Sequence, residues 1–339
     1  MSFDIIDGDG HVTETSEQIA RYLDEPYRRR PLQTPLFPQD AWDRRLIGTK
    51  GNWAGDGKSW VEALDSGGMS TAVLYPTLGL FAAFLRDAEW AVALCRAYNT
   101  MLAKEFTSVS PRLKGVALLP LQDPKAAAEE LRRAVRELGL VGAMLAADGY
   151  YLLGHERFDP IYAAAQELGV PVAIHAGGTD MGVAGHEPFP KFIQAHSCSH
   201  VFAQLRQITS VIFNGVLVRF PRLKIAFLEA GCGWVPFFVQ RLDEEWEKRG
   251  HIEAKLLTKS PTQYVRESNV YFSCEADEPL LPQALAYVPP DRIMYASDFP
   301  HWDHSYPKSV KELADRADLT ETQRASILSG TARRFYDLK

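Results

Sequence analysis

Short β-branched or apolar runs recur along the 339-residue chain. Runs of this kind predict strands that are buried on both faces, as in a parallel sheet. The eight expected strands cover residues 4–6, 71–75, 115–120, 142–146, 172–175, 224–228, 269–273 and 292–297. Stretches with apolar residues at helical spacing lie between them, so strand and helix alternate throughout.

The clearest of these helices is expected over 124–138. Asp123 can cap its first turn, Pro124 suits the first helical position, and Gly139 follows its end. Further helices are expected over 87–107, 160–168, 200–211, 235–248, 279–287 and 322–328.

Regular alternation of strand and helix requires right-handed crossovers and a parallel sheet. Eight units favour the α/β class and a closed (β/α)8 TIM barrel that forms one domain over 1–339. The alternative is a doubly wound open sheet, but no GxGxxG motif follows the first strand. Two irregular segments, at about 25–66 and 177–196, do not fit the repeat, and we expect them to be inserted loops that cover the C-terminal mouth of the barrel.

Composition narrows the choice of partners. The chain has 37 Lys and Arg against 43 Asp and Glu, a net charge of −6, which does not suit binding to nucleic acid. No apolar run is long enough for a membrane span, and the first residues lack the features of a signal peptide, so we expect a cytoplasmic protein. The four cysteines lie far apart without a CxxC pair, which is typical of reduced core thiols.

Four polar residues follow or end predicted strands. Asp9 and His11 are two residues apart at the end of the first strand, so their side chains point to the same side. His175 ends the fifth strand, and Asp298 follows the eighth. Taken singly, each could be a helix cap or a hydrogen-bonded core residue. Since the C-terminal ends of barrel strands converge on one mouth, together they predict a mixed nitrogen and oxygen site for a divalent metal.

Several longer motifs strengthen this interpretation. They are Asp9-x-His11, Ala173-Ile174-His175, Phe220-Pro221-Arg222-Leu223-Lys224, Trp234-Val235-Pro236, Arg241-Leu242-Asp243, Ser273 and Ala296-Ser297-Asp298-Phe299-Pro300-His301. With these motifs, nearly the whole chain resembles the amidohydrolase superfamily, in the branch of aminocarboxymuconate semialdehyde decarboxylase and related amidohydrolases. The resemblance implies that Asp9, His11, His175 and Asp298 are the metal ligands.

The resemblance also implies one metal rather than two, because Ala146-Ala147-Asp148 stands where a bridging lysine would end the fourth strand. Zinc suits the ligand set first, with manganese or iron as alternatives. The chain departs from the family pattern at Thr13, where the fuller motif has a second histidine. It departs again at Glu229, where the decarboxylases carry a histidine; a carboxylate there stays ionised near a cation and can act as a base.

Three functions are therefore considered. The first is a metal-dependent hydrolase that activates water with Asp298, Glu229 and His175 as catalytic residues. The second is a non-oxidative decarboxylase of an aromatic or unsaturated carboxylate, which carbon dioxide release would distinguish. The third, a binding module with a vestigial site, requires missing ligands, and none is missing.

The expected substrate is a small organic molecule with an aromatic or conjugated part. We expect His301, Arg45 and Trp53 to bind it, under a cover made by residues 42–60 and 177–196. Alternatively the tryptophans seal a dimer interface, and a homodimer is expected. His196 and His200 are spaced to share a helical face, either as ligands or simply at a helix start over the mouth.

Overall fold

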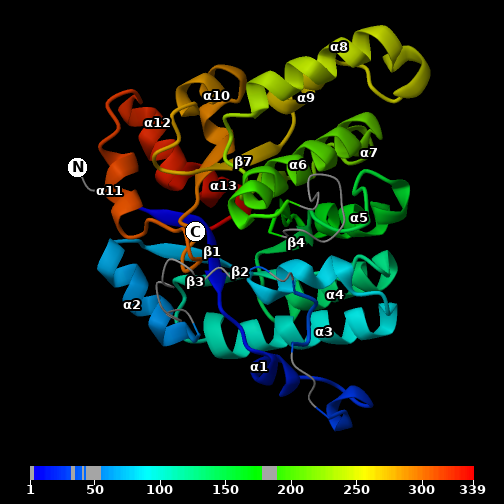
Figure 1. The fold of residues 1–339 in the computed structure, drawn as a ribbon, viewed down its shortest axis with the longest axis vertical. Coiled ribbons are helices and arrows are strands. Elements are labelled where there is room, and N and C mark those ends of the chain that lie inside the picture. The colour runs from blue at the N-terminus through cyan, green and yellow to red at the C-terminus, as the bar shows by residue number, and fades with distance from the viewer. Residues whose placement is uncertain (1–3, 32–34, 40–41, 43–54, 178–188) are drawn as a thin grey trace.

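A barrel of eight parallel strands forms the centre of the described part of the protein (Figure 1). The computed structural model describes residues 4–31, 35–39, 42, 55–177 and 189–339. Each strand pairs with the next in sequence order, from β1 to β8. The strands are Ile6–Val12 (β1), Thr71–Pro76 (β2), Leu113–Leu118 (β3), Gly142–Ala146 (β4), Val172–His175 (β5), Ile225–Leu228 (β6), Val270–Cys274 (β7) and Ile293–Tyr295 (β8).

Helices surround these strands (Figure 1). The described α-helices are Ser16–Ala20 (α1), Gly57–Gly67 (α2), Ala88–Met101 (α3), Pro124–Arg136 (α4), Asp159–Leu168 (α5), Phe192–Phe213 (α6), Val216–Arg219 (α7), Val235–Glu253 (α8), Pro261–Glu267 (α9), Leu281–Tyr287 (α10), Lys308–Ala314 (α11), Glu321–Ala325 (α12) and Thr331–Tyr336 (α13). The predicted TIM barrel is confirmed. None of the described helices combines the length and the apolar character needed for a bilayer span.

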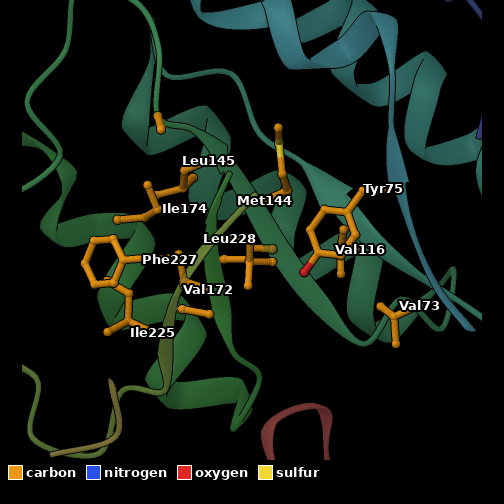
Figure 2. Close-up of a cluster of buried hydrophobic side chains, with 14 of the residues drawn as sticks. Val73, Tyr75, Val116, Met144, Leu145, Val172, Ile174, Ile225, Phe227 and Leu228 are labelled. Carbon is orange, nitrogen blue, oxygen red and sulfur yellow. The ribbon is translucent and has the colours of Figure 1, made fainter. Parts of the chain in front are cut away.

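Apolar side chains from neighbouring strands pack together into the core. Figure 2 shows part of this cluster, contributed by β2 to β6. The labelled members are Val73, Tyr75, Val116, Met144, Leu145, Val172, Ile174, Ile225, Phe227 and Leu228. Burial on this scale is the main favourable term in folding, and it fixes the strand ends that carry polar side chains.

The first strand differs most from its predicted bounds. It extends to Val12 rather than ending at residue 6, and its polar residues Asp7, Asp9 and His11 are buried. A strand that carries such residues lacks the apolar run from which strands are predicted. The register with β2 shifts between Asp7 and Gly10, a bulge of the kind that redirects side chains near functional sites.

A seam of backbone hydrogen bonds joins β1 to the segment that follows β8. The N–H of Asp298 donates to the backbone oxygen of Asp9 (3.1 Å), and the N–H of His11 donates to that of Phe299 (2.7 Å). From α13, the Tyr336 hydroxyl donates to the backbone oxygen of Gly8 (2.7 Å). The two ends of the chain therefore meet at the strand that carries Asp9 and His11.

Part of the expected cover has another role. Residues 57–66, assigned to the first insertion, belong to α2, the crossover helix from β1 to β2. Trp60 in this helix is fully buried, and its Nε1 donates to the backbone oxygen of His11 (2.9 Å). Trp60 therefore packs against β1 and does not cover the mouth, because its apolar ring gains more from burial against the barrel.

Glu14 ties the end of β1 to the segment after β2. Its carboxylate oxygens accept the backbone N–H groups of Thr77 (3.0 Å) and Gly79 (2.9 Å). Desolvation raises the pKa of this carboxyl from 4.5 to about 7, although the two hydrogen bonds oppose the rise.

We expect Glu14 to make the fold less stable as the pH rises from about 4.5 to about 7. In this window the folded state keeps the proton and the unfolded state releases it, so the free energy of unfolding falls, by at most about 3 kcal/mol. Urea unfolding between about pH 5 and 8 should show a steeper decline in the wild type than in Glu14→Gln, which keeps the contributions of other carboxyls with raised pKa values, such as Asp298. An equal decline in both proteins would contradict the assignment.

Candidate metal centre and its cavity

His11 is prepared for ligation by its own hydrogen bond. Its Nδ1 lies 2.9 Å from the backbone oxygen of Pro76, which can only accept, so Nδ1 carries the proton. Its Nε2 is buried without a hydrogen-bond partner. Desolvation, reinforced by His301 and His175, holds the pKa of His11 well below its usual value, so the ring is neutral. A neutral imidazole with a free lone pair is the form that binds a metal ion.

His175 at the end of β5 faces the first strand. Its Nε2 lies 2.9 Å from Oδ1 of Asp9. Its Nδ1 lies 2.5 Å from the backbone oxygen of Ala176 and 2.8 Å from Oε2 of Glu229. The acceptors around Nδ1 orient the ring and direct Nε2 towards Asp9 and His11.

Glu229 and Asp298 turn into the mouth through a strained backbone. Each follows a barrel strand and adopts a left-handed conformation, with φ of 59° at Glu229 and 53° at Asp298. Such values are uncommon outside glycine and gather at functional sites. The hydroxyl of Ser273 on β7 accepts the backbone N–H of Glu229 (3.1 Å) and helps to hold it there.

His301 lies directly beside these carboxylates. Its Nδ1 is 2.5 Å from Oδ1 of Asp298 and 3.6 Å from Oε1 of Glu229, and its Nε2 is 3.1 Å from the hydroxyl of Thr77. The rings of His301 and His11 lie 3.9 Å apart between centroids.

Two overlapping groups of donor atoms result from this arrangement, with the atoms of each group within 4.8 Å of one another. The first group is Asp9, His11 and His175, and the second is His11, Glu229, Asp298 and His301. The four expected ligands are thus divided between two groups that share His11, and Glu229 and His301 join Asp298 in the second. The buried Nε2 of His11 has no hydrogen-bond partner, as expected where a cation belongs.

The carboxylates differ in their ionisation. Desolvation raises the pKa of Asp298 to about 8, against the lowering effect of His301. Desolvation also opposes ionisation of Glu229, but His175 and His301 hold its pKa well below the usual range. The site therefore gives two neighbouring carboxyls widely different pKa values, an arrangement that suits proton transfer.

A cavity of about 260 Å³ opens above this cluster. Its lining includes Glu229 and His301 at the floor and an apolar side made by Leu78, Leu80 and Phe81. An aromatic group made by Trp42, Phe192 and Trp302 adjoins it, with the rings of Phe192 and Trp302 5.5 Å apart. A cavity of roughly 150 Å³ holds benzene, so a substituted ring fits here.

A second cavity of about 170 Å³ shares Glu229, His196, His200 and Asp303 with the first. It reaches Asp9 and Asp298 and is bordered by Glu275, Asp277, Ser273 and His304. His196 and His200 lie near the start of α6 with their rings 4.7 Å apart. The spacing of these histidines signalled a shared face, but only the structure shows that it faces the cavities.

Other residues were harder to place. Arg45 and Trp53, expected to bind substrate, lie outside the described residues, as do most of 42–60 and 178–188. Trp302 was not singled out, because an aromatic residue after a strand carries no signal of its own.

Comparison with known proteins agrees with this architecture. Residues 70–338 match a family model described as Amidohydrolase. The decarboxylase orsB of Emericella nidulans is 32% identical over 283 residues, covering 79% of this chain and 81% of that protein. The gamma-resorcylate decarboxylase of a Rhizobium species is 26% identical over 302 residues, covering 82% and 86%.

A solved structure extends the comparison. The 5-carboxyvanillate decarboxylase of Novosphingobium aromaticivorans, complexed with manganese and 4-hydroxy-3-methoxy-5-nitrobenzoic acid, has a TM-score of 0.79 at 22% identity, covering 99% of this chain and 97% of that one. At this identity the likeness establishes the shared fold. The names of these relatives contradict the expectation of a hydrolase and favour the alternative, non-oxidative decarboxylation.

Proposed function

Because the chain belongs to the amidohydrolase family, we propose that it is a metal-dependent, non-oxidative decarboxylase of an aromatic carboxylate. One observation carries the proposal beyond the names of the relatives. The buried Nε2 of His11 has no hydrogen-bond partner, and it lies in one group of donor atoms with Glu229 and His301, which line a cavity with room for one substituted ring.

Asp9, His11, His175 and Asp298 would hold one divalent metal. The donor set of two imidazoles and two carboxylates suits zinc, manganese or iron, and the manganese in the solved decarboxylase supports manganese here. A divalent cation supplies a positive charge that binds the substrate carboxylate and stabilises the negative charge that develops on the ring. A second, lysine-bridged metal is not expected, because Asp148 follows β4 and its Oδ2 accepts the N–H of Gly177 (2.9 Å).

The remaining groups handle the proton. Decarboxylation breaks the bond between the ring carbon and the carboxylate, releases carbon dioxide and leaves an electron pair that must take up one proton. Glu229 and His301 lie beside Asp298 and line the cavity, so they are placed to hold that proton and deliver it to the ring carbon. The apolar side chains on the cavity wall exclude water from this exchange.

Other expectations stay predictions. We still propose that Arg45 and Trp53 contact the substrate. We also propose a single domain with two insertions, a homodimer and a cytoplasmic location.

We expect the manganese-loaded protein to convert 2,6-dihydroxybenzoate into 1,3-dihydroxybenzene and carbon dioxide in equal amounts. Carboxyl-labelled substrate and mass spectrometry of the released gas measure this directly. Metal-stripped protein should be inactive and should recover when manganese is restored. If the carboxyl label stayed in dissolved products for every hydroxybenzoate in a panel, and none of it appeared as carbon dioxide, the result would contradict decarboxylation.

A further inference from the structure

The two cavities have opposite characters. The first is bordered by Leu78, Leu80, Phe81, Trp42 and Trp302, which offer an apolar surface to the face of a ring. The second is bordered by carboxylates, whose charges repel anions. Its acidic lining is Asp9, Glu229, Glu275, Asp277, Asp298 and Asp303.

The described residues that line either cavity include no lysine or arginine to balance this charge. The basic groups that face the acidic side are His196, His200 and His304. A metal at the floor would offset Asp9 and Asp298, which leaves Glu275, Asp277 and Asp303 as the outer acidic side.

Burial and the neighbouring carboxylates of this side both raise the pKa of Glu275. Desolvation first, and then the charges of Glu278, Asp277 and Asp303, raise the pKa of Glu275 to about 7. Asp277 and Asp303 are exposed at the rim. Above pH about 8 Glu275 is therefore ionised.

We propose that this site selects aromatic acids with a single carboxylate, and that Glu275, Asp277 and Asp303 exclude rings that carry a second one. This inference rests on the proposed function, which places the first carboxylate of the substrate at the metal ligands. The ring then lies against the apolar side, and its neutral hydroxyl or amino groups point towards the outer carboxylates as hydrogen-bond donors. A second carboxylate in the same place would meet like charges and find no cationic partner among the described side chains.

The expected size of the effect follows from Coulomb's law. At an effective dielectric constant between those of protein and water, one carboxylate about 8 Å from an anion weakens its binding roughly five-fold. After screening by salt, three such charges together should make a dicarboxylate bind at least about ten-fold more weakly than a monocarboxylate. The relatives include decarboxylases named for substrates of both kinds, gamma-resorcylate with one carboxylate and 5-carboxyvanillate with two.

Binding of two acids that differ by one carboxylate tests the proposal separately from turnover. Dissociation constants of 2-hydroxybenzoate and 2-hydroxybenzene-1,3-dicarboxylate for the manganese-loaded protein are measured by calorimetry at about pH 8.5 and low salt. We expect the monocarboxylate to bind at least about ten-fold more tightly. The double variant Asp277→Asn, Asp303→Asn should narrow this ratio about five-fold, since Glu275 remains, whereas Glu247→Gln, which removes an exposed charge on α8, should leave it unchanged.

Three results would overturn the proposal. They are equal or tighter binding of the dicarboxylate to the wild type, a ratio that the double variant does not change, and failure of the monocarboxylate to bind. Selective binding without carbon dioxide release from any monocarboxylate would instead uphold the selectivity and contradict the proposed reaction.

Discussion

Replacing His11 with alanine should abolish metal retention and lower decarboxylation by at least about 10³-fold. The substitution removes a buried imidazole whose Nε2 faces Asp9 and Asp298 at 3.7 and 3.5 Å. Changes to groups that only support metal ligands already cost roughly 10- to 100-fold in affinity or activity, so loss of a ligand should cost more. Elemental analysis after dialysis measures retained metal, and carbon dioxide release measures turnover.

His251→Ala is the matched control. This histidine is exposed on α8 and borders neither cavity, so its loss should change neither quantity. If His11→Ala kept one metal per chain and normal turnover, the assignment of the centre would be wrong.

Glu229→Gln should lower turnover by roughly 10²- to 10³-fold while metal content stays at the wild-type level. The amide keeps the size of the side chain but cannot exchange a proton, and general acid–base groups contribute about 10²- to 10⁴-fold. Because His175 and His301 hold the pKa of Glu229 well below its usual range, the loss of turnover should be similar across about pH 5 to 9. Turnover at each pH and metal content together distinguish the roles open to Glu229.

The outcomes separate cleanly. Metal loss together with activity loss would make Glu229 a ligand, and full turnover over the whole pH range would remove it from the chemistry. Glu129→Gln serves as the control, because this glutamate is exposed on α4 and borders neither cavity.

Much of the architecture can be predicted from the sequence because buried parallel strands are short and apolar. Strands β4 and β5 have their predicted bounds, and Asp123 caps α4 by accepting the N–H groups of Lys125 and Ala126 at 3.1 Å. The sequence could also group the four expected ligands, because the topology of a barrel brings all strand ends to one mouth. These ligands are Asp9, His11, His175 and Asp298.

Features that depend on tertiary contacts could not be predicted. The left-handed backbone at Glu229 and Asp298 is disfavoured locally, and the surrounding barrel imposes it. Trp60 looked like part of a cover, because an isolated tryptophan does not reveal which surface buries it. Hydrolysis was chosen over decarboxylation because both reactions use a cation and neighbouring carboxyls, so the ligand set alone does not discriminate.

The seam between β1 and the segment that follows β8 governs when this centre can exist during synthesis. Asp9 and His11 leave the ribosome early, but the backbone groups of Asp298 and Phe299 that bond to them emerge near the end of translation. A partly made chain therefore has half of the polar cluster without its partners. The full set of four expected ligands assembles only when Asp298 reaches the mouth, so completion of the centre would mark the last stage of folding.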